Sequence, residues 1–312
     1  MNLSKTYRKM ENAIFIMGSA RSGTTFLGSL IGSHSECVVT PESHFKIHCY
    51  PPQEEVSFDP EKTFNTIKNI KKYKNWNTKI SFTASEFDQI KNYSDLLLEI
   101  VKKYNINKQH KKTAKIWVEH APHNLEYVEL LKSLYPNAKF IHIIRDGRAI
   151  AASYQNITWG PRGMKNIASH WLKSLAYGFA YEAKYPEDVL SVKYEDLLSD
   201  TKTTVKKITD FIGLEYENNM LQANGLIVPE YTKHQHGLVG KKADKARINA
   251  WEKTLTKREI ELFEHETKNM LDLLEYDRLF IETKKEKRYE RILFKIKYKY
   301  VRFMNKRKKH LK

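Results

Sequence analysis

The chain has 312 residues, a net charge of +17 and a hydrophobic fraction of 41%, which is enough for one substantial core. Its two cysteines, Cys37 and Cys49, are too few for a disulfide-dense secreted scaffold, and we expect reduced thiols. No stretch approaches the roughly 18 apolar residues of a transmembrane helix, so the sequence predicts no membrane span.

The positive charge is unevenly distributed along the chain. Residues 283–312 contain 14 Lys or Arg and two Glu, so this segment carries +12 of the total. The rest is only mildly basic, which suits a protein that binds a small anion, and no specific nucleic-acid partner is expected. Residues 1–11 are polar and do not resemble a secretory signal, so we expect a cytoplasmic protein.

Short apolar runs alternate with stretches of helical periodicity, which predicts an α/β fold with a parallel sheet flanked by helices. We expect one domain over residues 1–282 and a tail over 283–312. The predicted strands are 13–17, 37–40, 115–119, 139–144 and 189–193, and the predicted helices are 24–33, 123–134, 147–157, 164–184 and 201–212. A last helix of the domain begins at the capping box formed by Thr256 and Glu259 and runs towards Leu274.

Residues 51–112 lack a buried-strand pattern and are rich in Lys, Asn and Tyr. We interpret them as a helical insertion, with helices at 61–74 and 84–104, that projects over the functional site. The alternative is a solvated helical pair with no role in the site.

The basic tail carries Leu293, Ile296, Tyr300 and Phe303 at roughly helical spacing. Residues 295–300 also alternate with period two, which leaves a strand open. As an amphipathic helix, the tail would suit the anionic surface of a membrane, which predicts a peripheral protein at the inner face. An RNA-binding or merely solvated charged tail is the alternative.

A glycine loop follows the first predicted strand and precedes the first predicted helix. Its sequence runs from Gly18 to Thr25 with Arg21 inside it, and it is almost a nucleotide-binding P-loop. Thr24 stands where kinases and GTPases have lysine, and the cation has moved to Arg21. The loop therefore predicts an anion site for a nucleotide that lacks a triphosphate.

A second candidate phosphate site follows the strand 139–144. Arg145 ends that strand, and Ser153 lies eight residues later, two helical turns along. A guanidinium and a hydroxyl at this spacing can both bond to one phosphate.

These two motifs, in this order and each behind an apolar strand, resemble those of the PAPS-dependent sulfotransferases, where PAPS is 3′-phosphoadenosine 5′-phosphosulfate. The residues of the glycine loop are most similar to those of the branch that contains tyrosylprotein, bacterial and carbohydrate sulfotransferases. The resemblance implies a P-loop-like fold in which Arg21 and the N–H groups of Ser22, Gly23, Thr24 and Thr25 hold the 5′-phosphosulfate. It also implies that Arg145 and Ser153 hold the 3′-phosphate.

The resemblance extends to two later segments. Tyr194, in the sequence Tyr-Glu-Asp-Leu, corresponds to a tyrosine beside the nucleotide. The segment from His236 to Trp251 is similar to a late loop that folds over PAPS, with Lys241 and Arg247 as candidate contacts. Gly237 departs from the family there, because a serine or threonine often precedes the Gly-Lys pair.

Transfer of a sulfuryl group to a hydroxyl needs a base, cations around the moving group and fixed alignment. The resemblance implies that Glu42 is the base, with His44 as the alternative, and that Arg21 stabilises the leaving group. His120 stands where relatives often have lysine, so a cation, a base and a hydrogen-bond donor all remain open for it. No His/Cys cluster has the spacing of a metal site.

The sequence therefore predicts a PAPS-dependent sulfotransferase that releases adenosine 3′,5′-bisphosphate. We expect the acceptor to be a hydroxyl of a cell-surface glycan or glycolipid, with a protein tyrosine or a small alcohol as alternatives. The two alternative functions are a P-loop kinase, which Thr24 contradicts, and an inactive nucleotide-binding scaffold at the membrane.

Overall fold

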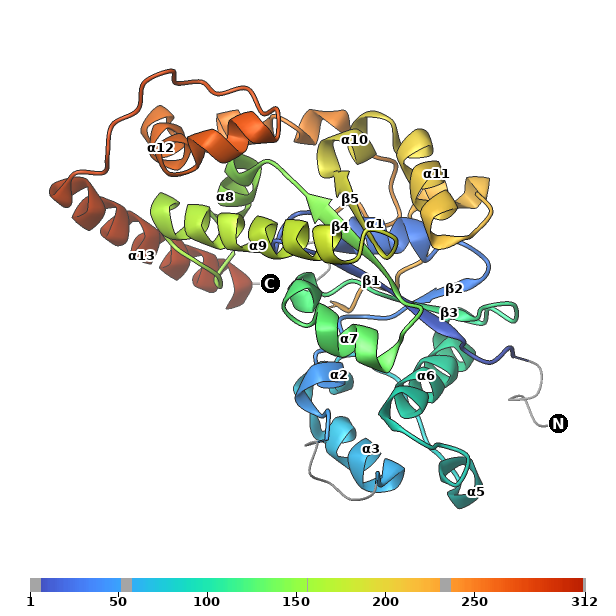
Figure 1. The fold of residues 1–312 in the computed structure, drawn as a ribbon. Coiled ribbons are helices and arrows are strands. Elements are labelled where there is room, and N and C mark those ends of the chain that lie inside the picture. Colours follow the sequence, from blue (N-terminus) through green and yellow to red (C-terminus); the bar gives the residue numbers. More distant parts are fainter. Residues whose placement is uncertain (1–6, 52–57, 156, 231–236, 311–312) are drawn as a thin grey trace.

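A five-stranded parallel sheet forms the centre of the protein (Figure 1). We describe it from a computed structural model, which covers residues 7–51, 58–155, 157–230 and 237–310. The spatial order is β2-β3-β1-β4-β5, and every neighbouring pair is parallel. The strands are β1 (Asn12–Gly18), β2 (Cys37–Val39), β3 (Ile116–Glu119), β4 (Lys139–Ile144) and β5 (Val189–Lys193).

The connections that follow the adjacent strands β1 and β4 run to opposite edges of the sheet. The connection after β1 leads to β2 at one edge of the sheet, and the connection after β4 leads to β5 at the other edge. Ligands of open α/β sheets bind in the crevice that such a reversal leaves at the carboxyl ends of the strands. The topology therefore places the candidate site between the segments that follow β1 and β4.

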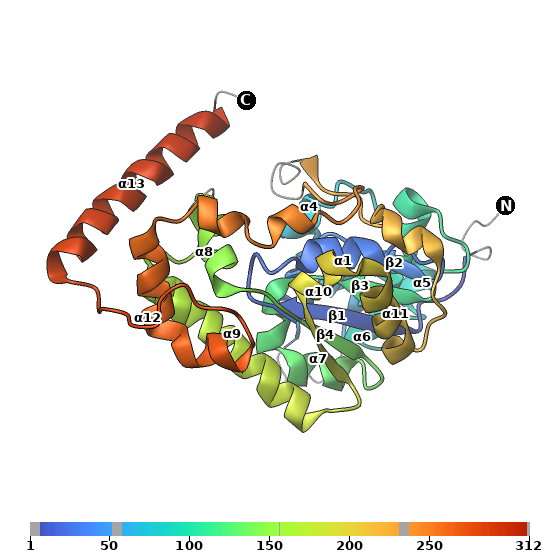
Figure 2. The ribbon, with the colours of Figure 1, turned by 90° about the horizontal axis from the view of Figure 1, so that it is seen from above.

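Helices cover both faces of the sheet (Figures 1 and 2). Side chains of β1 alternate between two cores, because successive residues of a strand point to opposite faces: Phe15 joins one core and Ile16 the other. The Ile16 core is closed by α1 (Thr24–Ile31), α10 (Tyr194–Ser199) and α11 (Thr201–Ile212). The Phe15 core is closed by α6 (Tyr93–Tyr104) and α7 (Val128–Leu134).

A third core lies beside the sheet and joins the C-terminal helices to the domain. Trp171 of α9 (Met164–Lys184) packs against Phe263 of α12 (Lys257–Leu273), with 5.8 Å between the ring centroids. Residues of α8 (Gly147–Gln155) and Tyr298 of α13 (Arg288–His310) complete this cluster. The tail is therefore a helix that docks on the domain, and the strand alternative is wrong.

The insertion is helical and belongs to the core. It contains α3 (Pro60–Asn69), α4 (Lys71–Lys74), α5 (Ala84–Phe87) and α6, which ends in a wider turn over Asn105–Gln109. Both predicted helices are interrupted: Ile70 is extended between α3 and α4, and α6 begins anew at its cap Asn92. Tyr104 and Trp76 are buried in the same cluster as Trp117 of β3, so the segment is not a solvated pair.

The predicted fold class is confirmed, and the predicted strands agree with the structure to within one residue at each end. The predicted helix 123–134 divides into a tight turn over Pro122–Glu126 and α7. Short elements complete the chain: α2 (Phe45–His48) and turns at Asn218–Gln222, Lys245–Arg247 and Ala250–Lys253. Cys37 and Cys49 are free thiols, and no described helix is long and apolar enough to cross a membrane.

The imidazole of His142 on β4 is almost fully buried, where it lies against Gly178 of α9 and 3.2 Å from the hydroxyl of Ser191. Burial lowers the pKa of His142 to about 4, below its value of about 6.5 in an unfolded chain. Between these two values the unfolded chain binds a proton that the folded chain excludes. The stability contributed by neutral His142 is complete above pH 6.5 and is lost as the pH falls towards 4.

We therefore expect His142→Asn to flatten the decline of unfolding free energy between pH 6.5 and 4 by up to about 1.4 kcal/mol per pH unit. Urea unfolding at a series of pH values measures this slope. The same substitution at the exposed His48 is the control and should leave the slope unchanged. Equal slopes for His142→Asn and the unmodified protein would contradict the argument.

Candidate active site

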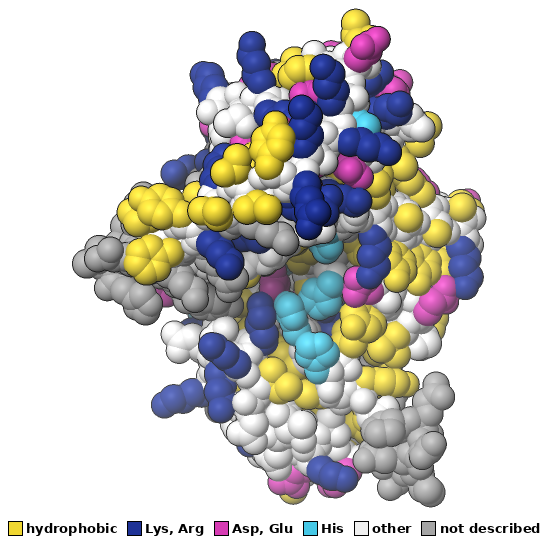
Figure 3. Space-filling view, turned by 90° about the vertical axis from the view of Figure 1, so that its left-hand side faces the viewer, with side chains coloured by type: hydrophobic (Ala, Val, Ile, Leu, Met, Phe, Trp, Pro, Cys, Tyr) yellow, Lys and Arg dark blue, Asp and Glu magenta, His cyan; other side chains and the backbone are white. Residues whose placement is uncertain are grey.

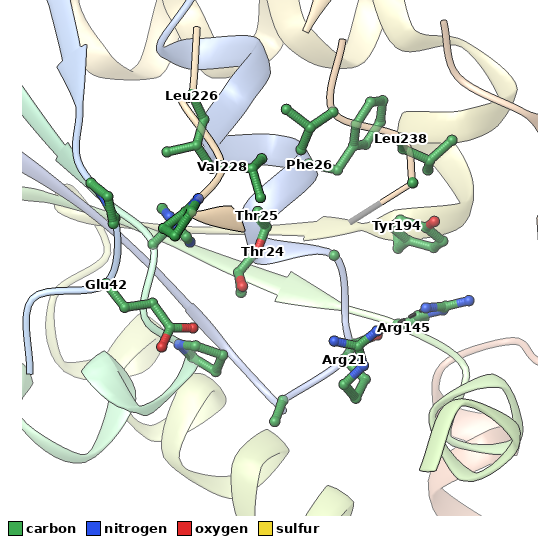
Figure 4. Close-up of a pocket in the computed structure, with 18 of the residues that line it drawn as sticks. Arg21, Thr24, Thr25, Phe26, Glu42, Arg145, Tyr194, Leu226, Val228 and Leu238 are labelled. Carbon is green, nitrogen blue, oxygen red and sulfur yellow. Dashed lines mark hydrogen bonds between the residues drawn. The ribbon is translucent and has the colours of Figure 1, made fainter. Parts of the chain in front are cut away.

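A cavity of about 330 Å³ opens at the carboxyl ends of the strands (Figure 4). All five strands contribute to its lining through the segment that follows each carboxyl end, because parallel strands end at the same edge of the sheet. Nine residues that the sequence singled out line the cavity: Arg21, Gly23, Thr24, Thr25, Glu42, His120, Arg145, Tyr194 and Arg247.

Four other predicted site residues do not line the cavity. Ser22 is buried in the glycine loop, and His44 and Ser153 contact the lining residues Glu42 and Arg21 respectively. Lys241 is exposed and lies outside the lining. The late loop begins at His236, which lies outside the described residues.

The backbone of the glycine loop takes left-handed conformations and leaves no room for a side chain at Gly23. Gly23 precedes α1 with φ of 103°, and a Cβ there would lie 2.6 Å from the ring of Tyr194. Arg21 also has a left-handed backbone, with φ of 76°, which costs about 1–3 kcal/mol for a residue with a side chain. This conformation places the N–H groups of the first turn of α1 around an open space, where they have no acceptor within the helix.

Arg21, Arg145 and Ser153 come together although they are far apart in the sequence. The guanidinium Nε of Arg21 donates to the hydroxyl of Ser153 at 3.0 Å, and Nη1 of Arg145 donates to the carbonyl of Arg21 at 2.8 Å. The guanidinium of Arg145 also stacks over Tyr194, 4.3 Å from the ring centroid. These contacts fix two cations at the junction of the β1 and β4 loops.

The charges at this junction favour an anionic ligand. Burial, followed by the charge of Arg145, lowers the pKa of the Arg21 guanidinium despite the opposing effect of Glu42. The buried polar atoms of the described residues that lack a hydrogen-bond partner include two at this junction, Nε of Arg145 and the hydroxyl oxygen of Ser22. An anion in the loop would bond to such donors and compensate both guanidinium groups.

Glu42 lies across the cavity from the two arginines (Figure 4). Nε2 of His44 lies 3.0 Å and Nζ of Lys72 lies 2.8 Å from the same carboxylate oxygen, Oε2. Burial by itself raises the pKa of Glu42, but the hydrogen bond from His44 and the charge of Lys72 outweigh it, so the pKa is well below its usual value. Glu42 is therefore ionised at neutral pH, and both of these bonds are made by Oε2.

His120 is a buried histidine at the end of β3, and its ring packs against Gly28 of α1. Burial lowers its pKa, and the nearby Glu42 and Glu119 only partly oppose this effect. The ring is thus neutral at pH 7, and neither ring nitrogen bonds to a described residue. A neutral imidazole can donate or accept one hydrogen bond, but it supplies no positive charge.

A buried carboxylate beneath the cavity holds the Glu42 segment in place. Glu119 accepts hydrogen bonds from the N–H of Ser43 at 2.9 Å and from the amide of Asn124 at 2.7 Å. Asn124 also donates to the carbonyl of Ile16 in β1. Nζ of Lys46 lies 3.0 Å from Glu119, and neither side chain is exposed. The ion pair therefore joins β3 to the segment after β2, and the hydrogen bonds of Asn124 connect it to β1.

The residues that follow Arg145 have structural roles. The N–H of Asp146 donates to Glu195, and the Asp146 carboxylate pairs with Arg148 at 2.8 Å. Arg148 also pairs with Glu264 of α12 and stacks on Trp251 at 4.1 Å from the ring centroid. This network fixes the end of β4 to the C-terminal helices, and it explains the Asp-Gly-Arg sequence without a ligand.

The lining residues that sequence reasoning missed include a cation, Lys72, and an aromatic residue, Trp159. Lys72 comes from the insertion and lies in a lysine-rich run, so no local pattern distinguishes it. Trp159 lies between α8 and α9 and is 46% exposed at the cavity. The sequence feature that could have indicated Trp159 is its place in segment 157–163, whose Gly and Pro residues are typical of a surface loop.

The fold and the site define an α/β protein with a glycine loop at the start of α1, paired arginines and a facing carboxylate. A profile described as the sulfotransferase family matches residues 13–218, and the chain belongs to that family. Among solved structures, the sulfotransferase domain from the curacin biosynthetic pathway superposes with a TM-score of 0.57 at 18% identity, over 87% of this chain and all of that one.

Two relatives match at the level of sequence. A putative protein-tyrosine sulfotransferase of Caenorhabditis briggsae is 23% identical, over 75% of this chain and 72% of the relative. An uncharacterised protein of Aquifex aeolicus is 26% identical over 68% of this chain, but the match spans only 27% of that protein.

The ion pair of Lys46 with Glu119 leads to a stability prediction. Lys46→Met leaves a buried carboxylate without its cation, so we expect the free energy of unfolding to fall by about 3–5 kcal/mol. Adding Glu119→Gln to the same chain removes that charge and should recover part of the loss. Urea unfolding of both variants tests this, and a double variant no more stable than Lys46→Met would refute the role of the ion pair.

Proposed function

We propose that this protein transfers a sulfuryl group from PAPS to a hydroxyl group and releases adenosine 3′,5′-bisphosphate. The observation that carries the proposal is the contact of the β1 loop with Arg145 and Ser153, which brings two candidate phosphate sites side by side. A nucleotide with anionic groups at both its 5′ and 3′ positions fits such a pair. Membership of the sulfotransferase family supports the same chemistry.

The donor set fits the two ends of PAPS. The N–H groups of Ser22 to Thr25 and the side chain of Arg21 hold the 5′-phosphosulfate, and the cradle at Gly23 has no room for a side chain. Arg145 and Ser153 hold the 3′-phosphate through charge-assisted hydrogen bonds. Tyr194 and Arg247 line the same cavity and flank the nucleotide. Lys241 is exposed and outside the lining, so a contact with PAPS requires its side chain or its loop to move.

Glu42 serves as the base in the proposed reaction. The acceptor oxygen attacks sulfur, its proton passes to Oε1 of Glu42, and the bond between sulfur and the phosphate oxygen breaks. The bisphosphate leaves with the electron pair of that bond, and Arg21 stabilises the negative charge. His120, neutral at pH 7, donates a hydrogen bond to the moving group, and His44 bonds to Oε2, so Oε1 is the proposed proton acceptor.

The proposed acceptor is a glycan or glycolipid of the cell surface, and sulfuryl transfer takes place at the cytoplasmic face of the membrane. Trp159 supports this proposal, since an exposed aromatic ring at a cavity is a suitable platform for the apolar face of a sugar. A protein tyrosine is the second candidate, because the Caenorhabditis briggsae relative is named as a putative protein-tyrosine sulfotransferase.

Binding of adenosine 3′,5′-bisphosphate tests the nucleotide site. We expect the bisphosphate to raise the melting temperature by mass action, whereas AMP and ATP with Mg²⁺ should not. Arg145→Ala should weaken binding about 10–100-fold, because it removes a charge-assisted bond to the 3′-phosphate. Lys202→Ala on the exposed side of α11 is the control and should bind normally. Selective stabilisation by ATP with Mg²⁺ would favour a kinase instead.

Glu42→Gln tests the base. We expect release of the bisphosphate from PAPS to fall about 10²–10⁴-fold in the presence of glycan, glycolipid and tyrosine-peptide acceptors. The thermal shift with the bisphosphate should persist, because Glu42 lies across the cavity from the arginines. Full turnover by Glu42→Gln, together with loss of turnover in His44→Asn, would assign the base to His44.

A further inference from the structure

The helix α13 has one face fixed to the domain. Tyr298 is only 7% exposed, and its hydroxyl lies 3.2 Å from Oε1 of Glu259. Lys297 pairs with the same oxygen at 2.8 Å. Nearer the start of the helix, the guanidinium of Arg258 binds both carboxylate oxygens of Glu290. These contacts come from α12, so they determine which side of α13 points away from the protein.

The opposite face of α13 is an exposed apolar stripe. Its members follow one another at steps of one, three or four residues, so they fall within about 100° of the helix circumference. Each is more than half exposed although the helix is docked. The apolar stripe consists of Tyr289, Ile292, Leu293, Ile296, Tyr300 and Phe303.

A stripe of this kind marks an interaction surface, since large apolar side chains in a row are costly to leave in water. The segment that carries it has a charge of +12 over residues 283–312. Figure 3 shows Lys and Arg side chains next to the apolar side chains on this face of the molecule. The partner must therefore accept apolar side chains and carry negative charge beside them.

We propose that α13 docks on the surface of an anionic lipid bilayer. The apolar stripe enters the boundary between headgroups and acyl chains, while exposed basic residues of the described part of the tail, such as Arg288 and Lys299, contact the anionic headgroups. The helix lies along the surface in this arrangement, held at a fixed angle by Tyr298 and by the ion pair of Arg258 with Glu290.

The observations favour a bilayer over two other occupants. A second copy of the chain would bring two segments of charge +12 together across the stripe, and their repulsion opposes pairing. RNA would neutralise the charge but would leave the aliphatic side chains of Ile292, Leu293 and Ile296 without an apolar partner.

Docking would also orient the cavity. Figure 3 shows histidine side chains gathered in a hollow beneath α13, on the same face of the molecule. Three histidines lie at the proposed base, because ring contacts join His44 to His48 and His123, and His44 bonds to Glu42. The hollow thus faces the bilayer when α13 docks, which suits an acceptor hydroxyl carried on a lipid; this last step rests on the proposed function.

Sedimentation of the full-length protein with lipid vesicles tests the docking. We expect binding to vesicles of phosphatidylcholine mixed with phosphatidylglycerol, weaker binding to phosphatidylcholine alone, and a steep loss of binding as salt is raised. Ile292→Gln combined with Ile296→Gln should reduce vesicle binding about tenfold or more, because it removes two apolar members of the stripe. Leu273→Gln with Leu279→Gln, at exposed apolar residues outside α13, should bind as the unmodified protein does.

The test separates docking from sulfuryl transfer. Both double variants should keep the melting temperature and the thermal shift with the bisphosphate, since all four side chains are exposed. Binding to mixed vesicles that survives the α13 substitutions, or that does not depend on salt, would overturn the proposal. So would a dimer of the unmodified protein that the α13 substitutions dissociate, or tight binding of single-stranded RNA with no binding to vesicles.

Discussion

The carboxylate of Glu119 has no exposed surface, and three parts of the candidate site are joined through it. It accepts hydrogen bonds from Ser43, next to Glu42, and from Asn124, which in turn binds β1. Lys46 compensates its charge at 3.0 Å. A buried ion is stable only when its partners are fixed, so Glu119 needs the loop geometry as much as the loop needs Glu119. The position of the proposed base, Glu42, is therefore determined by the buried residues Glu119, Lys46 and Asn124.

Above this base, the cavity separates charges of opposite sign. Arg21 and Arg145 stand on one side and the carboxylate of Glu42 on the other, as Figure 4 shows. An in-line transfer needs this separation, because the proton leaves on the side of the acceptor while negative charge grows on the side of the leaving group. The sheet topology produces it directly, since the arginines follow β1 and β4 at the reversal point and Glu42 follows β2 at the edge.

The sequence allowed the strands to be predicted because a strand buried on both faces is a short, continuous apolar run. Arg21 and Arg145 could be found for the same reason: each follows such a run closely, and the ends of parallel strands converge. Lys46 and Glu119 could not, because a charged residue is expected at the surface and only the tertiary fold shows that both are buried. The approach of Lys72 to Glu42 depends on how the insertion packs on the sheet, a contact across 30 residues that no local pattern encodes.

Lys72 links the insertion to the chemistry of the proposed reaction. With Lys72 and His44 bound to Oε2, the pKa of Glu42 is well below its usual value, and a carboxylate with so low a proton affinity is a weak base. An acceptor that draws Lys72 away would raise that pKa at the moment the proton must move. Acceptors that leave the ion pair intact would bind but react slowly, so selectivity would be expressed in kcat as well as in KM. The insertion would then select acceptors through the strength of the base, and not only through the shape of the cavity.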